Sequence, residues 1–146
     1  MPLFKRFARE PYIAVKDIMS SPVVTVQSES SLLEAAKSMR DRQVGSLAVT
    51  DGSGKLVGIL TERDIIYSAA NGLFEKHDAR VSSVMSKNLI TVRPEDNLSQ
   101  VIERMREFNL RHMIVTDTQG KAVGIVAMRD ILDIAIRLLR LLTPAG

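Results

Sequence analysis

The sequence predicts an α/β (α+β) fold in which two tandem β-α-β-β-α repeats pack together with pseudo-twofold symmetry. Three observations predict this architecture. The chain of 146 residues repeats itself after 66 positions, and each half contains short β-branched runs that are typical of strands. Each half also contains two stretches with apolar residues at helical spacing. A hydrophobic fraction of 45% and a charged fraction of 25% are ordinary for a folded domain.

The repeat is an ungapped match of residues 17–65 with residues 83–131, in which 19 of 49 positions are identical. Arg63-Asp64-Ile65, for example, returns as Arg129-Asp130-Ile131. A match of this length without a gap indicates a duplication. We therefore divide the chain into a basic leader (1–11), a first repeat (12–72), a linker (73–80), a second repeat (81–142) and a tail (143–146).

Each repeat begins with a strand and a helix. The runs "VVTV" (23–26) and "LITV" (89–92) predict strands, and the polar stretches "QSESS" and "RPEDN" after them supply helix N-caps. Apolar residues then recur at helical spacing. These are Leu32, Ala35, Ala36 and Met39 in the first repeat, and Leu98, Val101, Ile102 and Met105 in the second.

Each repeat ends with a β-hairpin and a second helix. The predicted second strands are "SLAVTD" and "HMIVTD", and the turns "GSGK" and "TQGK" carry the glycine and polar residues of a chain reversal. The third strands, "LVGILT" and "AVGIVA", lead directly into helices that start near Glu62 and Met128. The first strand must reach its neighbours through the helical crossover between them.

A sheet of only three strands needs a covering layer on each face. We expect the helices to cover one face of each sheet, and the twin repeat or a ligand to cover the other. Two copies of the unit then predict two clefts where the repeats meet. The last helix, "ILDIAIRLLRLL" (131–142), has apolar residues on more than one face, which favours packing on a partner subunit. The alternative is burial against the chain's own N-terminal segment.

Composition excludes several functional classes. The chain has no cysteine, which removes disulfides, thiolate nucleophiles and zinc–thiolate sites. No apolar run approaches the length of a membrane span, and the N-terminus lacks the apolar region of a signal peptide, so we expect a cytoplasmic protein without a membrane contact. The net charge of +3 lies in the first 16 residues, and the body of the chain is neutral. Only the leader could therefore attract nucleic acid.

The segment Thr61-x-x-Asp64, at the start of the helix after the third strand, supports two interpretations. In the first it is a capping box, in which Thr61 accepts a hydrogen bond from a helical N–H group. In the second the Asp64 carboxylate accepts hydrogen bonds from two ribose hydroxyls, while the free N–H groups of the helix attract a phosphate. Gly58 would permit close backbone approach. Both can hold together, because a cap can also face a cleft.

The paired units resemble the cystathionine-β-synthase (CBS) domain family, in the tandem arrangement called a Bateman module. The resemblance is carried by the openings at residues 17–26 and 84–92 and by the closings "VGILTERDI" (57–65) and "VGIVAMRDI" (123–131). It covers roughly residues 12–140. It implies a regulatory protein that binds AMP, ADP, ATP or S-adenosylmethionine and forms a dimer, commonly a flat disk of four CBS units. In most members the pair regulates a fused enzyme, channel or transporter.

The resemblance also implies a site. We expect Thr61 and Asp64 to hold the ribose and apolar side chains near the first strand to flank the adenine, and we expect basic groups to neutralise the phosphates. The apolar residues are Ile18, Val23 and Val24, and the candidate phosphate ligands are Arg63, Arg111, His112 and Arg129. The second repeat has Ala127 in place of Thr61 but retains Asp130. The two clefts are therefore not equivalent, and we predict that the hydroxyl marks the one that is filled.

The favoured function is a sensor that binds an adenosine nucleotide, AMP first and ADP or ATP next, and signals to a separate protein. One alternative is a protein- or nucleic-acid-interaction module that uses the leader, which the neutral body disfavours. Another is binding of an S-adenosylmethionine- or NAD-type ligand. We expect no metal, no required cofactor and no enzymatic activity, because no catalytic motif occurs and the two histidines, His77 and His112, are far apart in the sequence.

Overall fold

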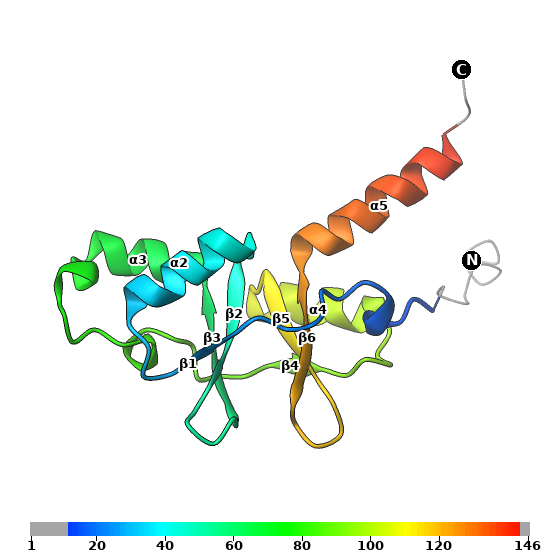
Figure 1. Cartoon of the computed structure of the whole chain (residues 1–146). Coiled ribbons are helices and arrows are strands. Elements are labelled where there is room, and N and C mark those ends of the chain that lie inside the picture. Colours follow the sequence, from blue (N-terminus) through cyan, green and yellow to red (C-terminus); the bar gives the residue numbers. More distant parts are fainter. Residues whose placement is uncertain (1–11, 144–146) are drawn as a thin grey trace.

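Two small mixed sheets with their helices make up the molecule, which is described over residues 12–143 by a computed structural model (Figure 1). The first repeat contains β1 (Thr25–Gln27), α2 (Leu32–Arg42), β2 (Ser46–Thr50), β3 (Leu56–Thr61) and α3 (Glu62–Ala70). The second contains β4 (Thr91–Val92), α4 (Leu98–Phe108), β5 (His112–Thr116), β6 (Ala122–Ala127) and α5 (Met128–Leu142). The predicted fold class and the order of elements are confirmed. Short 3-10 turns lie at η1 (Val15–Asp17), η2 (Leu73–Glu75) and η3 (Val81–Ser83).

The strand order is the same in both sheets. β1 lies parallel to β2, which pairs antiparallel with β3, and β4, β5 and β6 repeat this pattern. The crossover and the hairpin are thus both where the sequence predicts them. In the first hairpin the Asp51 carboxylate accepts from the N–H groups of Ser53 (2.9 Å) and Lys55 (3.0 Å), and Gly54 takes the positive φ of 85° that closes the turn.

Alternate residues of the central strands face different layers. Leu47 and Val49 of β2 are fully buried in the core beneath the helices of the first repeat. Ala48, between them, faces the other way and packs with Ile114 of β5 and Ile125 of β6. This period of two places the helices on one face of each sheet and the twin sheet on the other, as expected.

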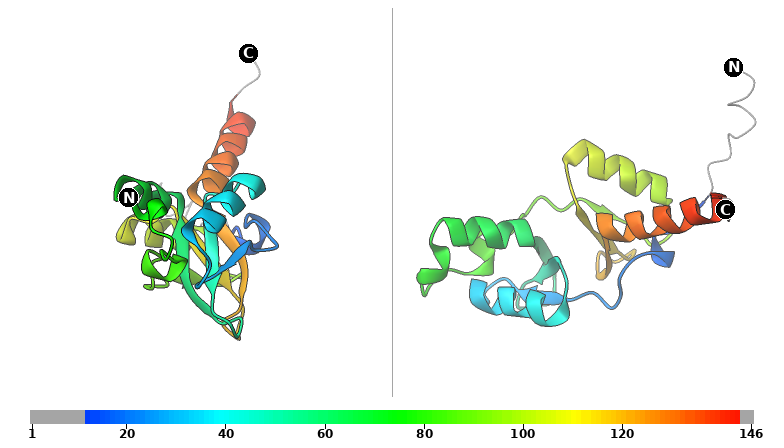
Figure 2. Two further views of the ribbon diagram at one scale, coloured as in Figure 1. Left: turned by 60° about the vertical axis from the view of Figure 1, so that its left-hand side comes forward. Right: turned by 90° about the horizontal axis from the view of Figure 1, so that it is seen from above.

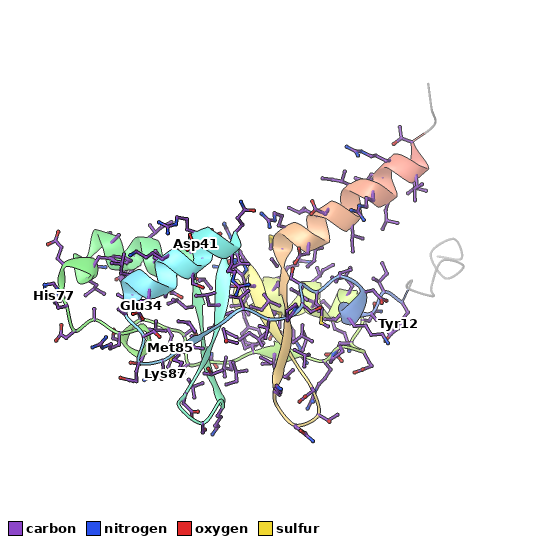
Figure 3. All side chains as sticks on the ribbon, viewed as in Figure 1. Tyr12, Glu34, Asp41, His77, Met85 and Lys87 are labelled. Carbon is purple, nitrogen blue, oxygen red and sulfur yellow. The ribbon has the colours of Figure 1, made fainter. Side chains whose placement is uncertain are left out.

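The segment that leads into each repeat packs on the core of the opposite repeat. We call residues 13–20 and 79–86 the lead-in segments. Val15 and Met19 pack in the core of the second repeat, and Val81 and Met85 pack in the core of the first. Figure 3 labels Met85 on the side of the first repeat and Tyr12 on the side of the second. The repeats are therefore joined by an exchange of their lead-in segments.

Backbone hydrogen bonds fix this exchange at two glycines. Ser20 and Ile125 exchange both N–H···O bonds (2.9 and 3.1 Å), and Ser86 and Ile59 do the same (2.9 and 3.0 Å). A Cβ atom added at Gly124 would lie 2.6 Å from the Met19 sulfur, and one at Gly58 would lie 2.7 Å from the Met85 sulfur. Gly58 thus permits a close backbone approach, as expected, but the approaching group is a lead-in segment of the same chain.

The last helix extends away from the sheets. Figure 2 shows α2 and α3 over the first repeat, and α4 and α5 over the second, with α5 projecting beyond the body. Its apolar side chains Leu132, Ile136 and Leu139 are 56%, 48% and 63% exposed. None of the helices in the described part of the chain has the length and apolar character needed to cross a membrane. The basic leader (1–11), as a candidate cover for α5 or a contact for nucleic acid, lies outside the described residues.

Candidate functional site

Two clefts open between the repeats, and each is named here for the aspartate that lines it. The Asp130 cleft has a volume of about 850 Å³ and the Asp64 cleft one of about 390 Å³. Each is built from both repeats, because each aspartate faces the segment that follows the other repeat's lead-in. Ser20 to Val24 line the Asp130 cleft, and Ser86 with Asn88 to Ile90 line the Asp64 cleft.

The two aspartates have the same local geometry. Asp64 and Asp130 are each the third residue of their helix. Asp64 Oδ2 accepts from the backbone N–H of Thr61 at 2.8 Å, and Asp130 Oδ2 accepts from that of Ala127 at 2.9 Å. Within residues 12–143, neither Oδ1 atom has a hydrogen-bond partner. One oxygen therefore orients each carboxylate, and the other is available to donors in the cleft.

The Thr61 hydroxyl also belongs to this arrangement. It donates to Asp64 Oδ2 at 3.2 Å, whereas a capping box requires it to accept from a helical N–H group. The expected cap is thus only half formed, by the carboxylate and not by the hydroxyl. The hydroxyl helps to hold the carboxylate, and Ala127 lacks this contact in the second repeat.

A wall of five residues separates the clefts and lines both of them: Glu62, Asn109, Leu110, Arg111 and His112. Glu62 begins α3 and His112 begins β5, so the wall combines residues of both repeats. A Cβ atom at Gly45 would lie 3.0 Å from His112 Cε1 and 3.2 Å from Glu62 Oε1. The glycine therefore leaves the space that these two side chains occupy, whereas its counterpart in the second repeat is Arg111.

His112 is the residue of the wall whose environment shifts its pKa. Its Nδ1 atom is buried and has no hydrogen-bond partner among the described residues. Burial lowers the pKa of His112, which outweighs the opposite effect of the carboxylates of Glu62 and Asp130, and Arg111 and Arg129 lower it further. The neutral imidazole is therefore favoured in the folded protein.

The clefts differ in charge. Arg40, Arg106, Arg111 and Arg129 line the Asp130 cleft against two carboxylates, Glu62 and Asp130. Arg63 and Arg111 line the Asp64 cleft against Glu62 and Asp64. With His112 neutral, the lining side chains give the larger cleft a formal charge of +2 and leave the smaller cleft neutral. Arg40 pairs with Asp41 at 2.8 Å, and this ion pair reduces the charge of the larger cleft to +1.

The structure divides the predicted site residues between the two clefts. Thr61, Arg63 and Asp64 line the smaller cleft, whereas Val23, Val24, Arg129 and Asp130 line the larger one. Arg111 and His112 line both. The expected combination of Thr61 and Asp64 with Val23 and Val24 in one site is therefore not what the structure brings together. The exchange of lead-in segments is the physical reason.

One further expectation about a site residue differs from the structure. Ile18 lines neither cleft, because it packs against the core of the second repeat. His77 lies at the outer end of the first repeat, far from the wall (Figure 3).

Several cleft residues were not singled out from the sequence. Arg40 and Arg106 are identical at equivalent positions of the repeats, which was an available signal. Gln43 and Asn109, which follow α2 and α4, line the clefts with left-handed φ values of 54° and 53°. Both residues are the C-caps of their helices, where a left-handed conformation is common, so their backbone gave no signal of the site. Glu62 carried no signal, because its counterpart is Met128.

The residues that the structure describes contain no group of three or more histidine, aspartate or glutamate side chains that could hold a metal ion. What the clefts offer is hydrogen-bond acceptors, arginine donors and apolar walls. Such a set suits an organic ligand with hydroxyl groups, a flat apolar part and an anionic part.

Comparison with known proteins gives two matches to the CBS domain family model, at residues 15–71 and 81–137. One curated relative is the L-aspartate semialdehyde sulfurtransferase of Methanocaldococcus jannaschii, with 33% identity over 123 residues. The match covers 84% of this chain and 23% of that enzyme. The chain thus spans less than a quarter of that relative.

Solved structures agree with this fold. The CBS domain pair of protein MJ0100, in complex with 5′-methylthioadenosine and S-adenosyl-L-methionine, has 33% identity and a TM-score of 0.77, and the match covers 85% of this chain and 96% of that one. A CBS domain protein of Pyrobaculum aerophilum in complex with AMP has 26% identity and a TM-score of 0.75, with 85% and 99% covered.

Proposed function

This chain belongs to the CBS domain family, and we propose that it is a regulatory module that binds an adenosine nucleotide between its repeats and signals to a separate protein. The observation that carries the proposal is the pair of aspartates at the clefts. Each has one oxygen held by the backbone and the other without a protein partner, beside an apolar wall and arginine side chains. The solved CBS pairs with AMP and with adenosine-type ligands support it.

In this proposal the free carboxylate oxygen accepts from the ribose hydroxyls. In the Asp130 cleft the adenine lies against Val23 and Val24, which the lead-in segment positions there. Arg129 and its neighbours bind the phosphates, as arginine does through paired N–H donors. The charge and volume of this cleft support a phosphorylated ligand, with AMP first and ADP or ATP next. The prediction that Thr61 marks the filled cleft stays a prediction. The Thr61 hydroxyl donates to Asp64 Oδ2, so its contribution to the Asp64 cleft is to hold the carboxylate.

An S-adenosylmethionine-type ligand is the second candidate, and the neutral Asp64 cleft favours it over a phosphorylated one. This cleft is smaller, and its two arginines are balanced by two carboxylates. It suits an adenosine ligand without phosphate. The protein- or nucleic-acid-interaction alternative depends on the leader, which is outside the described residues.

The experiment is a thermal-shift and calorimetry series with AMP, ADP, ATP and S-adenosylmethionine on the wild type, Asp64→Ala and Asp130→Ala. A ligand at 100 times its Kd stabilises the protein by about 2.7 kcal/mol. We expect Asp130→Ala to abolish most of the AMP shift. Asp133→Ala is the matched control, since Asp133 is an exposed acid of the same helix that lines neither cleft. No shift with any of the ligands would refute the proposed function.

We also propose that the chain is a binding module and not an enzyme. Asp64 and Asp130 line different clefts, so they do not form a carboxylate pair in one site. Turnover of ATP by the wild type that Asp64→Ala abolishes would contradict this. A cytoplasmic location, expected from the sequence, is part of the same proposal.

Assembly into a homodimer completes the proposal. The exposed apolar residues Ile66 and Tyr67 of α3 and Leu132, Ile136 and Leu139 of α5 lie on equivalent helices of the two repeats. An apolar surface of this kind favours a partner. We propose that a second copy covers it, as in the disk of four CBS units, and that the regulated protein contacts the dimer.

A further inference from the structure

The wall between the clefts carries one arginine that faces both. Arg111 lines the Asp130 cleft and the Asp64 cleft, whereas every other arginine of the site lines only one of them. It is exposed and forms no ion pair with any described carboxylate. The repeat offers no second copy of it, because the equivalent position is Gly45, where His112 and Glu62 fill the space.

A single guanidinium can serve only one phosphate well at a time. Its donors form a planar fork that binds a phosphate through two parallel hydrogen bonds, and this fixes the direction of the side chain. Besides Arg111, the Asp130 cleft has Arg106 and Arg129 and also Arg40, which pairs with Asp41, so it attracts a phosphate more strongly than the Asp64 cleft does. A phosphorylated ligand is thus expected to fill the Asp130 cleft first, where Arg111 lies in the lining and is available to its phosphate.

Loss of Arg111 to a phosphate in the other cleft affects the two clefts unequally. Without Arg111 the Asp64 cleft retains Arg63 against Glu62 and Asp64, a formal charge of −1. A second phosphate would then meet an acidic cleft and also the first phosphate across the wall, in a partly desolvated site where charges interact strongly. An uncharged nucleoside would meet neither penalty, because its binding does not need the guanidinium.

We propose that Arg111 is shared by the two clefts, so that a phosphorylated ligand in the Asp130 cleft lowers the affinity of the Asp64 cleft for a second phosphorylated ligand but not for an uncharged nucleoside. This inference rests on the proposed function. The module then distinguishes ligand combinations. A nucleotide with a nucleoside-type ligand can fill both clefts, whereas two nucleotides compete.

The test is isothermal titration of the full chain with AMP and with adenosine. In Asp130→Ala the titration gives the affinity of the Asp64 cleft alone. In the wild type it gives the affinity of the same cleft while the Asp130 cleft is filled. We expect AMP to bind the Asp64 cleft at least about fivefold more tightly in Asp130→Ala than as the second ligand of the wild type, the lower end of typical coupling between sites. The same ratio for adenosine should be close to one.

Two arginine variants identify the mechanism. Arg111→Gly, which copies Gly45, should bring the AMP ratio towards one. Arg63→Ala removes the same charge from the Asp64 cleft without touching the shared residue, so it should weaken AMP there in both backgrounds and preserve the ratio. High salt should reduce the coupling, because screening weakens interactions between phosphates.

The outcomes separate the two proposals. Four outcomes would each overturn the sharing of Arg111 and leave the proposed function standing. They are independent AMP sites in the wild type, a ratio for adenosine as large as that for AMP, an AMP ratio that Arg111→Gly leaves unchanged, and no AMP binding in Asp130→Ala. No binding of any adenosine ligand by the wild type would overturn the proposed function and the coupling with it. Complete exclusion of a second AMP from the wild type, together with AMP binding to the Asp64 cleft of Asp130→Ala, would support the sharing of Arg111.

Discussion

Substitution of Gly58 by alanine tests the exchange of lead-in segments directly. The added Cβ atom would lie 2.7 Å from the Met85 sulfur and 2.8 Å from the carbonyl oxygen of Ser86. The thioether can rotate away, but the carbonyl is backbone and already accepts the N–H of Ile59 at 3.0 Å. The lead-in segment must therefore move away from β3.

The expected cost follows from this geometry. Overpacking a well-packed position costs about 1–3 kcal/mol, and the weakened backbone pair between Ile59 and Ser86 places Gly58→Ala in the upper part of that range. For a domain of this size, each kcal/mol lowers Tm by about 2–4 °C. Gly124→Ala should cost a similar amount, because its Cβ atom would lie 2.6 Å from the Met19 sulfur and 3.0 Å from the Ser20 carbonyl oxygen.

The assay is urea denaturation followed by circular dichroism, with Gly52→Ala as the matched control. No atom lies within 4 Å of a Cβ placed at Gly52, so this variant should change the free energy of unfolding by less than about 0.5 kcal/mol. A second readout is ligand binding, since Ser86 lines the Asp64 cleft and Ser20 lines the Asp130 cleft. If Gly58→Ala is as stable as Gly52→Ala, the two repeats are not joined as described.

Two further predictions concern the shared wall and α5. Burial lowers the pKa of His112, so below pH 6.5 the unfolded chain binds more protons than the folded one, and acidification destabilises the fold. Between pH 7.5 and 5.5 the wild type should lose more free energy of unfolding than His112→Gln, and equal losses would contradict the burial argument. On α5, Ile136→Glu should convert the proposed dimer to a monomer in light scattering, whereas Leu33→Glu, at an exposed position of α2, should not. A wild-type monomer would contradict the proposed dimer.

The sequence predicts the fold well because each repeat carries its own local signals. The periods of two and 3.6, the polar caps and the turn glycines each depend only on neighbouring residues, and the helices of the structure begin at Leu32 and Leu98, where they are expected. The repeat then doubles the evidence for every element. The two aspartates were identified for the same reason, since the Asp64 motif returns intact at Asp130.

The composition of each cleft could not be obtained in this way. Nothing local in the sequence states that residues 13–20 pack on the second repeat and residues 79–86 on the first. The simplest assumption places each strand beside the aspartate of its own repeat, which joins Val23 to Asp64. In the structure Val23 lies with Asp130. The sequence also does not indicate that Glu62 lies in the wall, because this position depends on the space that Gly45, distant in the sequence, leaves open.

The same helices carry both the aspartates and the surface proposed for dimerisation. Asp64 and Asp130 lie in the first turns of α3 and α5, and two residues further on stand Ile66 and Leu132. These two equivalent side chains each line a cleft, and they are also 68% and 56% exposed within the apolar face of their helix. In the proposed dimer a ligand would therefore touch residues that the second copy also contacts. If the ligand changes the affinity of the dimer through these residues, dimerisation must change the affinity for the ligand by the same factor, because coupling between two binding events is reciprocal.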